Sequence, residues 1–414
     1  MTISSDILPV AGIRWATASA GIKKLAAGAA RPDLALMEIA AGGSAAAVFT
    51  RNAFAAAPVQ VARANLLRWQ SVAESTALYC LVNAGNANAG TGRDGLQAAQ
   101  TSCDFLCSEL QQQKIAERAA VLPFSTGVIG EPLPLAKIEA ALPALVGALD
   151  ENGWRDAARA IMTTDTVPKT ASMRIELSTG QVVLSGIAKG AGMIKPDMAT
   201  MFAFIASDAV LSRGNLQQLL AAAVTRSFNR ITVDGDTSTN DACLLAASGA
   251  SGVSIEAGTN DWEIFSAALE SIFVSLATAI IRDAEGASKF IAIDVTGGRS
   301  SAECLRVAYA VAESPLVKTA FFASDANWGR ILAAVCRAGV EDFNIDAVVL
   351  TLGGYCICRN GARTADYDEA RAGDIMAQPE ITVGIELGRG DCSERVWTSD
   401  LSHDYVRINA EYRT

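Results

Sequence analysis

Apolar residues recur along this chain at spacings typical of a protein that mixes helices with strands. Residues 77–83 form a continuous apolar run, ALYCLVN, that predicts a buried strand leading into a loop rich in glycine and asparagine. After the loop, apolar residues lie three and four positions apart, which predicts a helix with one buried face. These residues are Leu96, Ala99, Cys103, Leu106 and Leu110.

The same reasoning predicts two more helices and several strands. Leucines at helical spacing cover residues 214–228, and a longer apolar stripe with aromatic residues covers 261–283. Residues 1–75 mix short apolar runs with glycine and alanine, and we expect strands and loops there. Further apolar runs predict strands at 182–188, 201–206 and 289–295. The residues alone therefore favour a mixed α/β globular fold.

Composition and charge narrow the classes of function. The chain has 414 residues, half of them apolar, and a formal net charge of −10 that opposes a phosphate backbone, so we expect no nucleic-acid partner. Every stretch of about 18 residues contains a charge or a glycine, which argues against a membrane span. The first residues look like neither a secretion signal nor a transit peptide, and the nine scattered cysteines do not look like a disulfide framework. We therefore expect a cytoplasmic protein.

The chain has a single histidine, His403, which limits the chemistry available to it. A Ser-His-Asp relay or a zinc site built from several imidazoles would have to depend on this one residue. His403 stands in a polar stretch, where a hydrogen-bonded surface or structural role is the simpler interpretation. Any covalent catalysis is therefore expected to use a base other than imidazole.

Residues 189–209, KGAGMIKPDMATMFAFIASDA, offer such a base. The glycine-rich segment breaks at Pro196 and returns abruptly to apolar sequence at Met201, with Thr200 at the junction. If the Thr200 hydroxyl attacks the preceding carbonyl, hydrolysis of the resulting ester frees an α-amine, whose unperturbed pKa is about 7.7–8.0. That amine can then deprotonate its own hydroxyl. From these residues alone, a threonine that simply begins a strand is the competing interpretation.

Eight blocks of the sequence resemble, in order, the ornithine acetyltransferase family, the bifunctional glutamate N-acetyltransferases of arginine biosynthesis. The resemblance runs nearly from end to end. Family members often have serine and cysteine where this chain has Ala84 and Ala89, a difference that bears on packing or the substrate pocket rather than on reaction type. The blocks are NAGNANAGTG (83–92), STGVIGEPLP (125–134), IMTTDTVPK (161–169), KGAGMIKPDMATM (189–201), SFNRITVDGDTSTNDA (227–242), RDAEGASKF (282–290), FFASDANWGR (321–330) and HDYVRINAEYRT (403–414).

The resemblance implies self-cleavage between Ala199 and Thr200, after which Thr200 accepts the acetyl group as an ester. It assigns Thr126 and Gly127 to an oxyanion hole, whose donors stabilise a tetrahedral intermediate more than the ground-state carbonyl. The activity that it implies is transfer of acetyl from N-acetylornithine to glutamate. Whether acetyl-CoA is also a donor, and whether the chain serves a secondary-metabolite pathway instead, both stay open.

The family's substrate-binding residues match several positions besides Thr200, and their chemistry suits amino-acid substrates. Such substrates carry an α-carboxylate, and ornithine also carries an ammonium group, so a cation, an anion and neutral hydrogen-bonding groups are needed to orient them. Lys189 can neutralise the carboxylate, and Glu285 can face the ammonium. Without the resemblance, a solvated lysine, a helix-end charge and an ordinary tail would be the simpler interpretations. The matching positions are Thr163, Lys189, Glu285, Asn409 and Thr414.

The resemblance also implies an architecture. The family's fold is a layered α/β sandwich with a smaller α/β domain near the C-terminus, which here covers about residues 292–414. Cleavage would give an α fragment, 1–199, and a β fragment, 200–414, and two copies of each would form a heterotetramer. No metal and no organic cofactor is implied.

Two alternatives compete with this hypothesis. One is a related self-cleaving hydrolase, such as an aminopeptidase, in which water rather than an amine takes the acyl group. The other is a nucleotide-binding module, indicated by the spacing of Gly85 and Gly90 in a turn-rich loop. That loop has Thr91 and Gly92 where a P-loop needs lysine followed by serine or threonine, so the match fails at the charged residue.

Overall fold

The chain divides into two compact units in the computed structural model. The structure describes residues 3–4, 6–23, 31–72, 75–195 and 201–411. Unit 1 comprises Met1–Gly190, Pro196–Asn229 and Thr237–Ile280. Unit 2 comprises Ala191–Lys195, Arg230–Asp236 and Ile281–Thr414. Unit 2 therefore includes the whole of the predicted small domain, 292–414, and begins earlier in the chain.

Unit 1 contains two sheets, of strand order β1-β2-β4-β5 and β3-β10-β8-β7-β6. The pairs β4–β5 and β8–β10 are parallel. The strands predicted at 77–83, 182–188 and 201–206 are confirmed as β4, β7 and β8. The four-stranded sheet consists of β1 (Ile13–Ala18), β2 (Leu34–Ile39), β4 (Ala77–Asn86) and β5 (Ala119–Val128). The five-stranded sheet consists of β3 (Ser44–Phe49), β10 (Ala242–Ala247), β8 (Phe202–Ser207), β7 (Gly180–Lys189) and β6 (Lys169–Leu177).

The two sheets of unit 1 face each other across one apolar core. Because side chains alternate between the faces of a strand, Phe202 and Phe204 on β8 point to the same side. Both belong to the core that Trp15 and Met37 enter from the four-stranded sheet. The Trp15 and Phe204 rings pack edge to face with their centroids 5.5 Å apart. This contact holds the sheets together as the inner layers of a sandwich.

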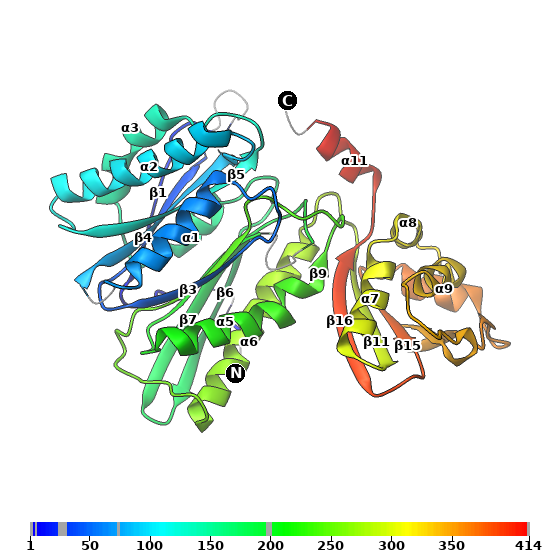
Figure 1. Ribbon diagram of the computed structural model, residues 1–414. Coiled ribbons are helices and arrows are strands. Elements are labelled where there is room, and N and C mark those ends of the chain that lie inside the picture. Colours follow the sequence, from blue (N-terminus) through cyan, green and yellow to red (C-terminus); the bar gives the residue numbers. More distant parts are fainter. Residues whose placement is uncertain (1–2, 5, 24–30, 73–74, 196–200, 412–414) are drawn as a thin grey trace. The chain divides into compact units, whose positions relative to one another are not determined.

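Helices cover the outer faces of both sheets. Helices α2 (Gly92–Gln112) and α3 (Leu135–Gly147) lie on the four-stranded sheet and share an apolar cluster with its outward-facing residues (Figure 1). Helices α5 (Arg213–Arg226) and α6 (Asn260–Arg282) pack on the five-stranded sheet. The three predicted helices are confirmed as α2, α5 and α6, and the predicted class, a layered α/β sandwich, is confirmed for unit 1.

One helix of the N-terminal region was not predicted. The expectation of strands and loops alone over residues 1–75 is wrong at α1 (Ala57–Trp69). Proline is favoured in the first turn of a helix because the N–H it lacks would be unbonded there, and α1 begins at Ala57 and Pro58. Its buried residues recur at helical spacing, which the alanine-rich sequence conceals. They are Val59, Ala62, Leu66 and Trp69. A short helix, α4 (Trp154–Ala160), completes unit 1.

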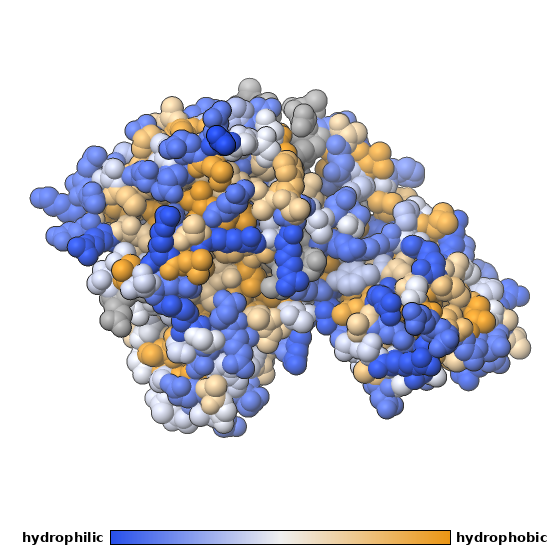
Figure 2. Space-filling view, in the orientation of Figure 1, coloured by the Kyte–Doolittle hydropathy of each residue, from blue (hydrophilic) through white to orange (hydrophobic). Residues whose placement is uncertain are grey.

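By length and composition alone, α6 could cross a membrane, and 50% of its most apolar window is buried inside the protein. Core helices of soluble proteins meet the same test. Two contacts within unit 1 support the core role: Phe273 packs against Phe228, and Leu276 lies beside Gly186 of β7. On the face of the molecule displayed in Figure 2, hydrophilic and apolar side chains are interspersed.

Unit 2 is a smaller α/β unit built on a seven-stranded sheet, as the predicted fold class requires. Its order is β14-β13-β12-β15-β11-β16-β9, and the strand predicted at 289–295 is confirmed as β11. The strands are β9 (Ile231–Thr232), β11 (Phe290–Gly298), β12 (Val349–Leu352), β13 (Tyr355–Arg359), β14 (Ala362–Arg363), β15 (Glu380–Glu386) and β16 (Cys392–Ser399). The helices are α7 (Ser301–Ala312), α8 (Pro315–Phe322), α9 (Trp328–Cys336), α10 (Glu369–Met376) and α11 (His403–Ala410).

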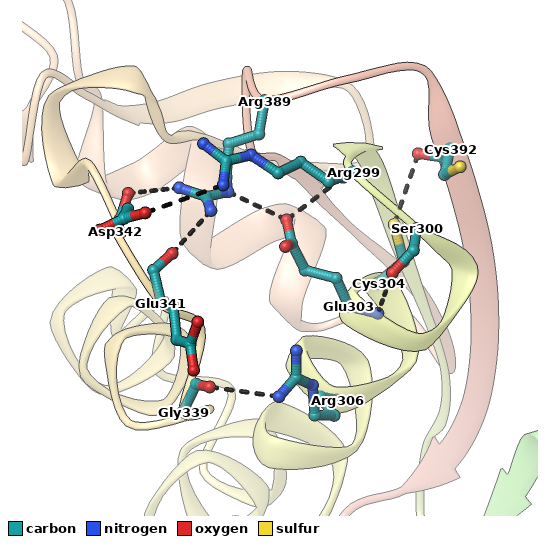
Figure 3. A network of polar contacts seen from close by, with 10 residues as sticks. All are labelled: Arg299, Ser300, Glu303, Cys304, Arg306, Gly339, Glu341, Asp342, Arg389 and Cys392. Atoms are coloured by element: carbon teal, nitrogen blue, oxygen red, sulfur yellow. Dashed lines mark hydrogen bonds and ion pairs between the residues drawn. The ribbon is translucent and has the colours of Figure 1, made fainter.

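A buried ion pair joins the loop after β15 to the first turn of α7 (Figure 3). Arg389 Nε lies 3.0 Å from Glu303 Oε1, and the Arg389 guanidinium also donates to the Glu341 carbonyl at 2.7 Å. Ser300 caps α7 by accepting a hydrogen bond from the Glu303 N–H. Because the guanidinium has several partners, this buried charge is compensated on more than one side. All nine cysteines, including Cys304 beside this network, are free thiols.

Candidate active site

Thr126 and Gly127 lie near the end of β5, where β5 approaches β4 unusually closely. Gly127 has a φ of +134°, and a Cβ atom there would lie 2.3 Å from the carbonyl carbon of Gly85. Only glycine fits this position, because a side chain would collide with the backbone of β4. Thr126 is buried, with 8% of its surface exposed. The two residues predicted for the oxyanion hole therefore occupy a tightly fixed strand end.

Lys189 links Thr126 to the other sheet of unit 1. It is the last residue of β7 and pairs with Phe202, the first residue of β8. Its Nζ atom donates a hydrogen bond to Thr126 Oγ1 at 2.9 Å. The structure thus brings two predicted site residues together from the two facing sheets. Because the Thr126 oxygen accepts this bond, its own O–H proton is directed elsewhere and can be donated to another group.

A buried carboxylate, Asp165, organises the end of β7. It accepts hydrogen bonds from Lys169 Nζ at 2.6 Å, from the Gly190 N–H at 2.7 Å and from the Thr163 N–H at 3.0 Å. Burial alone would raise the pKa of Asp165, but the charges of Lys169 and Lys189 and these hydrogen bonds outweigh it and lower the pKa to about 2. An ionised Asp165 therefore fixes the backbone of Thr163, another predicted site residue, beside that of Gly190.

Three predicted residues, Ala199, Thr200 and Thr414, lie outside the described residues. The described chain resumes directly after Thr200, at Met201. The Met201 carbonyl accepts a hydrogen bond from the Ala242 N–H at 3.0 Å. The roles assigned to these residues stay predictions. Strand β8, which pairs with the strand that ends at Lys189, begins at Phe202, two residues after Thr200.

In unit 2, the predicted site residues Glu285 and Asn409 lie in direct contact. Asn409 Nδ2 donates to Glu285 Oε2 at 2.7 Å, and the Glu285 N–H donates to the Ala191 carbonyl at 2.9 Å. The carboxylate rests against Gly192, where a Cβ atom would lie 2.3 Å from Oε2. The carboxylate can take this position because Gly192 has no side chain.

Asp234, which we had not singled out from the sequence, anchors the segment beside Glu285. Its carboxylate accepts hydrogen bonds from the Met193 N–H at 2.7 Å, from the Ile194 N–H at 2.9 Å and from the Tyr405 hydroxyl at 3.1 Å. Burial and the neighbouring Asp234 raise the pKa of Tyr405, so its hydroxyl stays protonated and donates. Helix α11 and residues 193–194 are thereby tied to one carboxylate within unit 2.

Amide side chains in the asparagine-rich loop support the strand ends instead of pointing outward. Asn86 Nδ2 donates to the carbonyls of Glu131 and Pro132 at 3.1 and 3.0 Å, and Asn88 Nδ2 donates to the Gly95 carbonyl at 3.0 Å. The richness in asparagine was visible in the sequence, but these partners were not. These amides therefore hold the segment after β5 and the first turn of α2, and they are occupied by backbone carbonyls of the protein itself.

Comparison with known proteins identifies the family. The arginine biosynthesis bifunctional protein ArgJ of Methylococcus capsulatus is 56% identical over 413 residues, which cover 99% of this chain and 98% of that protein. The protein of the same name from Pseudomonas fluorescens is 50% identical over 409 residues, 98% of this chain and 97% of that protein. A crystal structure of ArgJ from Bacillus halodurans is 38% identical and covers 51% of this chain and 100% of that one, with a TM-score of 0.49.

Both relatives are named for arginine biosynthesis, and this chain is an enzyme with a layered α/β fold. The sequence profile of the ArgJ family matches residues 14–414. The chain belongs to the ArgJ family, which confirms the resemblance drawn from the eight sequence blocks.

Proposed function

We propose that this enzyme transfers an acetyl group from N-acetylornithine to glutamate through an acetyl ester on Thr200, after cutting its own chain between Ala199 and Thr200. Membership of the ArgJ family supports the pathway, and the contact between Lys189 Nζ and Thr126 Oγ1 is the observation that supports the mechanism. That contact places a cation and a hydroxyl donor at the end of β7, whose partner strand β8 begins just after Thr200 in the sequence.

The proposed chemistry needs an oxyanion site and a base. Thr200 Oγ attacks the acetyl carbonyl, the oxygen of that carbonyl becomes negative, and Thr126 and Gly127 stabilise it by hydrogen bonding. The C–N bond of the tetrahedral intermediate then breaks, and the ornithine amine leaves with the proton given up by Thr200. The amine of glutamate next attacks the acetyl ester, gives a proton to the base and displaces Thr200 Oγ, which takes that proton back. The one histidine, His403, packs against Phe322 at the start of α11, and the base that we assign to this step is the α-amine of Thr200.

We assign substrate recognition to charged side chains that each meet a substrate group of the opposite charge. Glu285, held by Asn409, would face the ammonium of ornithine, and Lys189 would contribute positive charge toward a substrate carboxylate while it orients Thr126. Thr163, whose backbone is fixed by Asp165, would supply a neutral hydrogen-bonding group, as would Thr414. The proposal includes a cytoplasmic location and a heterotetramer of two α and two β fragments, with acetyl-CoA as a second acetyl donor and no metal or organic cofactor.

One pair of measurements tests the proposed function. Intact-mass analysis should find two fragments, one of them starting at Thr200, and incubation with N-acetylornithine alone should add one acetyl mass to that fragment. Acetyl transfer to glutamate should then be measured separately from N-acetylornithine and from acetyl-CoA. Release of acetate faster than formation of N-acetylglutamate would favour the hydrolase alternative, and an uncut chain with full activity would exclude the N-terminal amine from the mechanism.

Gly192→Ala should weaken donor binding without unfolding the protein. The added Cβ would displace the end of the Glu285 side chain, not the backbone. We expect KM for N-acetylornithine to rise about tenfold, since a hydrogen bond to a charged group contributes roughly 1.5–3 kcal/mol. Gly214→Ala, where an added Cβ meets nothing within 4 Å, is the matched control. An unchanged KM in steady-state assays of Gly192→Ala would show that the Glu285 carboxylate does not contact the donor.

A further inference from the structure

A single buried amide, Asn240, bridges the two sheets of unit 1 beside Thr126. Asn240 lies just before β10 of the five-stranded sheet. Its Nδ2 atom donates to the Ala87 carbonyl at 2.6 Å and to the Ser125 carbonyl at 2.7 Å, both on the four-stranded side. Both N–H groups of the amide are therefore used, each on the backbone of a different segment near the end of β4 or in β5.

The amide has little freedom to move. Asn240 is 6% exposed, and its Oδ1 atom accepts a hydrogen bond from the Thr239 hydroxyl. The backbone on each side is also held, because the Thr239 carbonyl accepts from the Ala56 N–H and the Asp241 carbonyl accepts from the Thr50 N–H, both at 2.9 Å. Buried amides with all their hydrogen bonds made are rigid parts of a structure.

The bond to Ser125 bears directly on the candidate oxyanion hole. Ser125 comes immediately before Thr126, and its side chain is also fixed, since its hydroxyl donates to Asn83 Oδ1. The peptide between Ser125 and Thr126 is planar and trans, so holding its carbonyl oxygen sets the plane of the whole peptide and the direction of the Thr126 N–H. The backbone that leads into Thr126 and Gly127 is therefore oriented by Asn240.

We infer that Asn240 is a positioning residue for the oxyanion hole, acting through Ser125 on Thr126 and Gly127. The inference rests on the proposed function. The oxyanion donors, Thr126 and Gly127, belong to the fragment before the proposed cut. Asn240, which positions them, belongs to the fragment after it. A misplacement of donors by about 1 Å can cost roughly 100-fold in rate, so a residue that does not touch substrate can still control the reaction.

The test uses Asn240→Ala and Asn240→Asp, with Asn52→Ala as the control. Asn52 Nδ2 makes a comparable pair of hydrogen bonds, to the Thr237 carbonyl and hydroxyl at 3.1 and 3.2 Å, and its loss leaves the bonds to Ala87 and Ser125 in place. Asn240→Asp keeps the shape of the side chain but sets a carboxylate oxygen against two carbonyl oxygens. The readout is the rate and the end point of acetylation of the Thr200 fragment by N-acetylornithine.

We expect acetylation by both Asn240 variants to be about 100-fold slower than by the wild type but to reach the same end point, with KM for N-acetylornithine within about threefold. Asn52→Ala should match the wild type in rate and end point. A structural role alone would instead lower the end point, because some molecules would be misfolded, and leave the rate of the rest unchanged.

That second pattern, or a wild-type rate with a full end point, would overturn the inference. Neither result would contradict the proposed function. The proposed function is tested by whether the wild type gains an acetyl group on the Thr200 fragment. If the Asn240 variants are still partly uncut when purified, the cleavage rate of the precursor replaces acetylation as the readout, because the carbonyl of Ala199 would need the same oxyanion donors. A precursor that cuts at the wild-type rate would then contradict the inference.

Discussion

Thr200→Ala should give a folded, uncut protein whose acetyl transfer falls by at least about four orders of magnitude, as when a covalent nucleophile is removed from other acyl-transfer enzymes. Two functions are lost together, because the hydroxyl both cuts the chain and carries the acetyl group. Electrophoresis should show one band, and circular dichroism should match that of the wild type. The oxyanion donors at Thr126 and Gly127 remain, so any residual activity reports on them alone.

Thr200→Ser separates the two functions of the hydroxyl. Serine keeps an Oγ atom but lacks the methyl group that restricts the rotamers of threonine, so the variant should cut incompletely and transfer acetyl more slowly. Ping-pong kinetics should persist in the cut fraction. If wild-type kinetics require both substrates bound at once and no acetyl mass appears on the fragment that begins at Thr200, direct transfer is the better account and Thr200 is only the cleavage residue.

Asp165→Asn should lower the free energy of unfolding by about 3–5 kcal/mol, the usual cost of leaving one partner of a buried ion pair uncompensated. Lys169 Nζ would then be a buried charge facing a neutral amide, since both side chains are almost fully buried. Urea unfolding followed by tryptophan fluorescence suits this test, because Trp15, Trp69 and Trp154 lie buried in unit 1. The double variant Asp165→Asn/Lys169→Met should recover much of the loss.

The same residue predicts a dependence on pH. The folded pKa of about 2 lies below the ordinary value of 3.8, so the ionised Asp165 contributes its full stabilisation above pH 3.8 and loses it as the pH falls toward 2. A shift of this size corresponds to about 2 kcal/mol. The difference in stability between the wild type and Asp165→Asn should therefore shrink in acid. A constant difference from pH 6 to pH 3 would show that folding does not lower the pKa of Asp165.

Regular apolar spacing made much of the fold predictable. The stripes of α2, α5 and α6 and the apolar runs of β4, β7, β8 and β11 are local patterns, and each reports which face of an element is buried. Helix α1 was missed because alanine supplies part of its buried face and carries little periodic signal. The pairing of strands into two facing sheets was not predictable from spacing, since β3 pairs with β10 nearly two hundred residues away.

In the candidate site, too, some residues could be predicted from the sequence and others depend on contacts between distant segments. Thr126, Lys189, Glu285 and Asn409 were singled out by resemblance, and the structure joins them in two pairs. The residues that orient those pairs were missed. Asp165, Asp234 and Asn240 act through hydrogen bonds to backbone groups, and nothing in their neighbouring sequence indicates which carbonyl or N–H they will meet. Such partners are fixed only when distant segments pack together.

The strand order β3-β10-β8-β7-β6 has a consequence for how the enzyme can be made. The two strands that follow the proposed cut, β10 and β8, lie between strands that precede it, with β3 on one side and β7 and β6 on the other, so the sheet needs strands from both fragments. Cleavage would thus come after assembly of the sheet, and the extent of cutting would serve as an internal record of correct folding. In a recombinant preparation, the uncut fraction on a gel would measure the molecules that never formed this sheet.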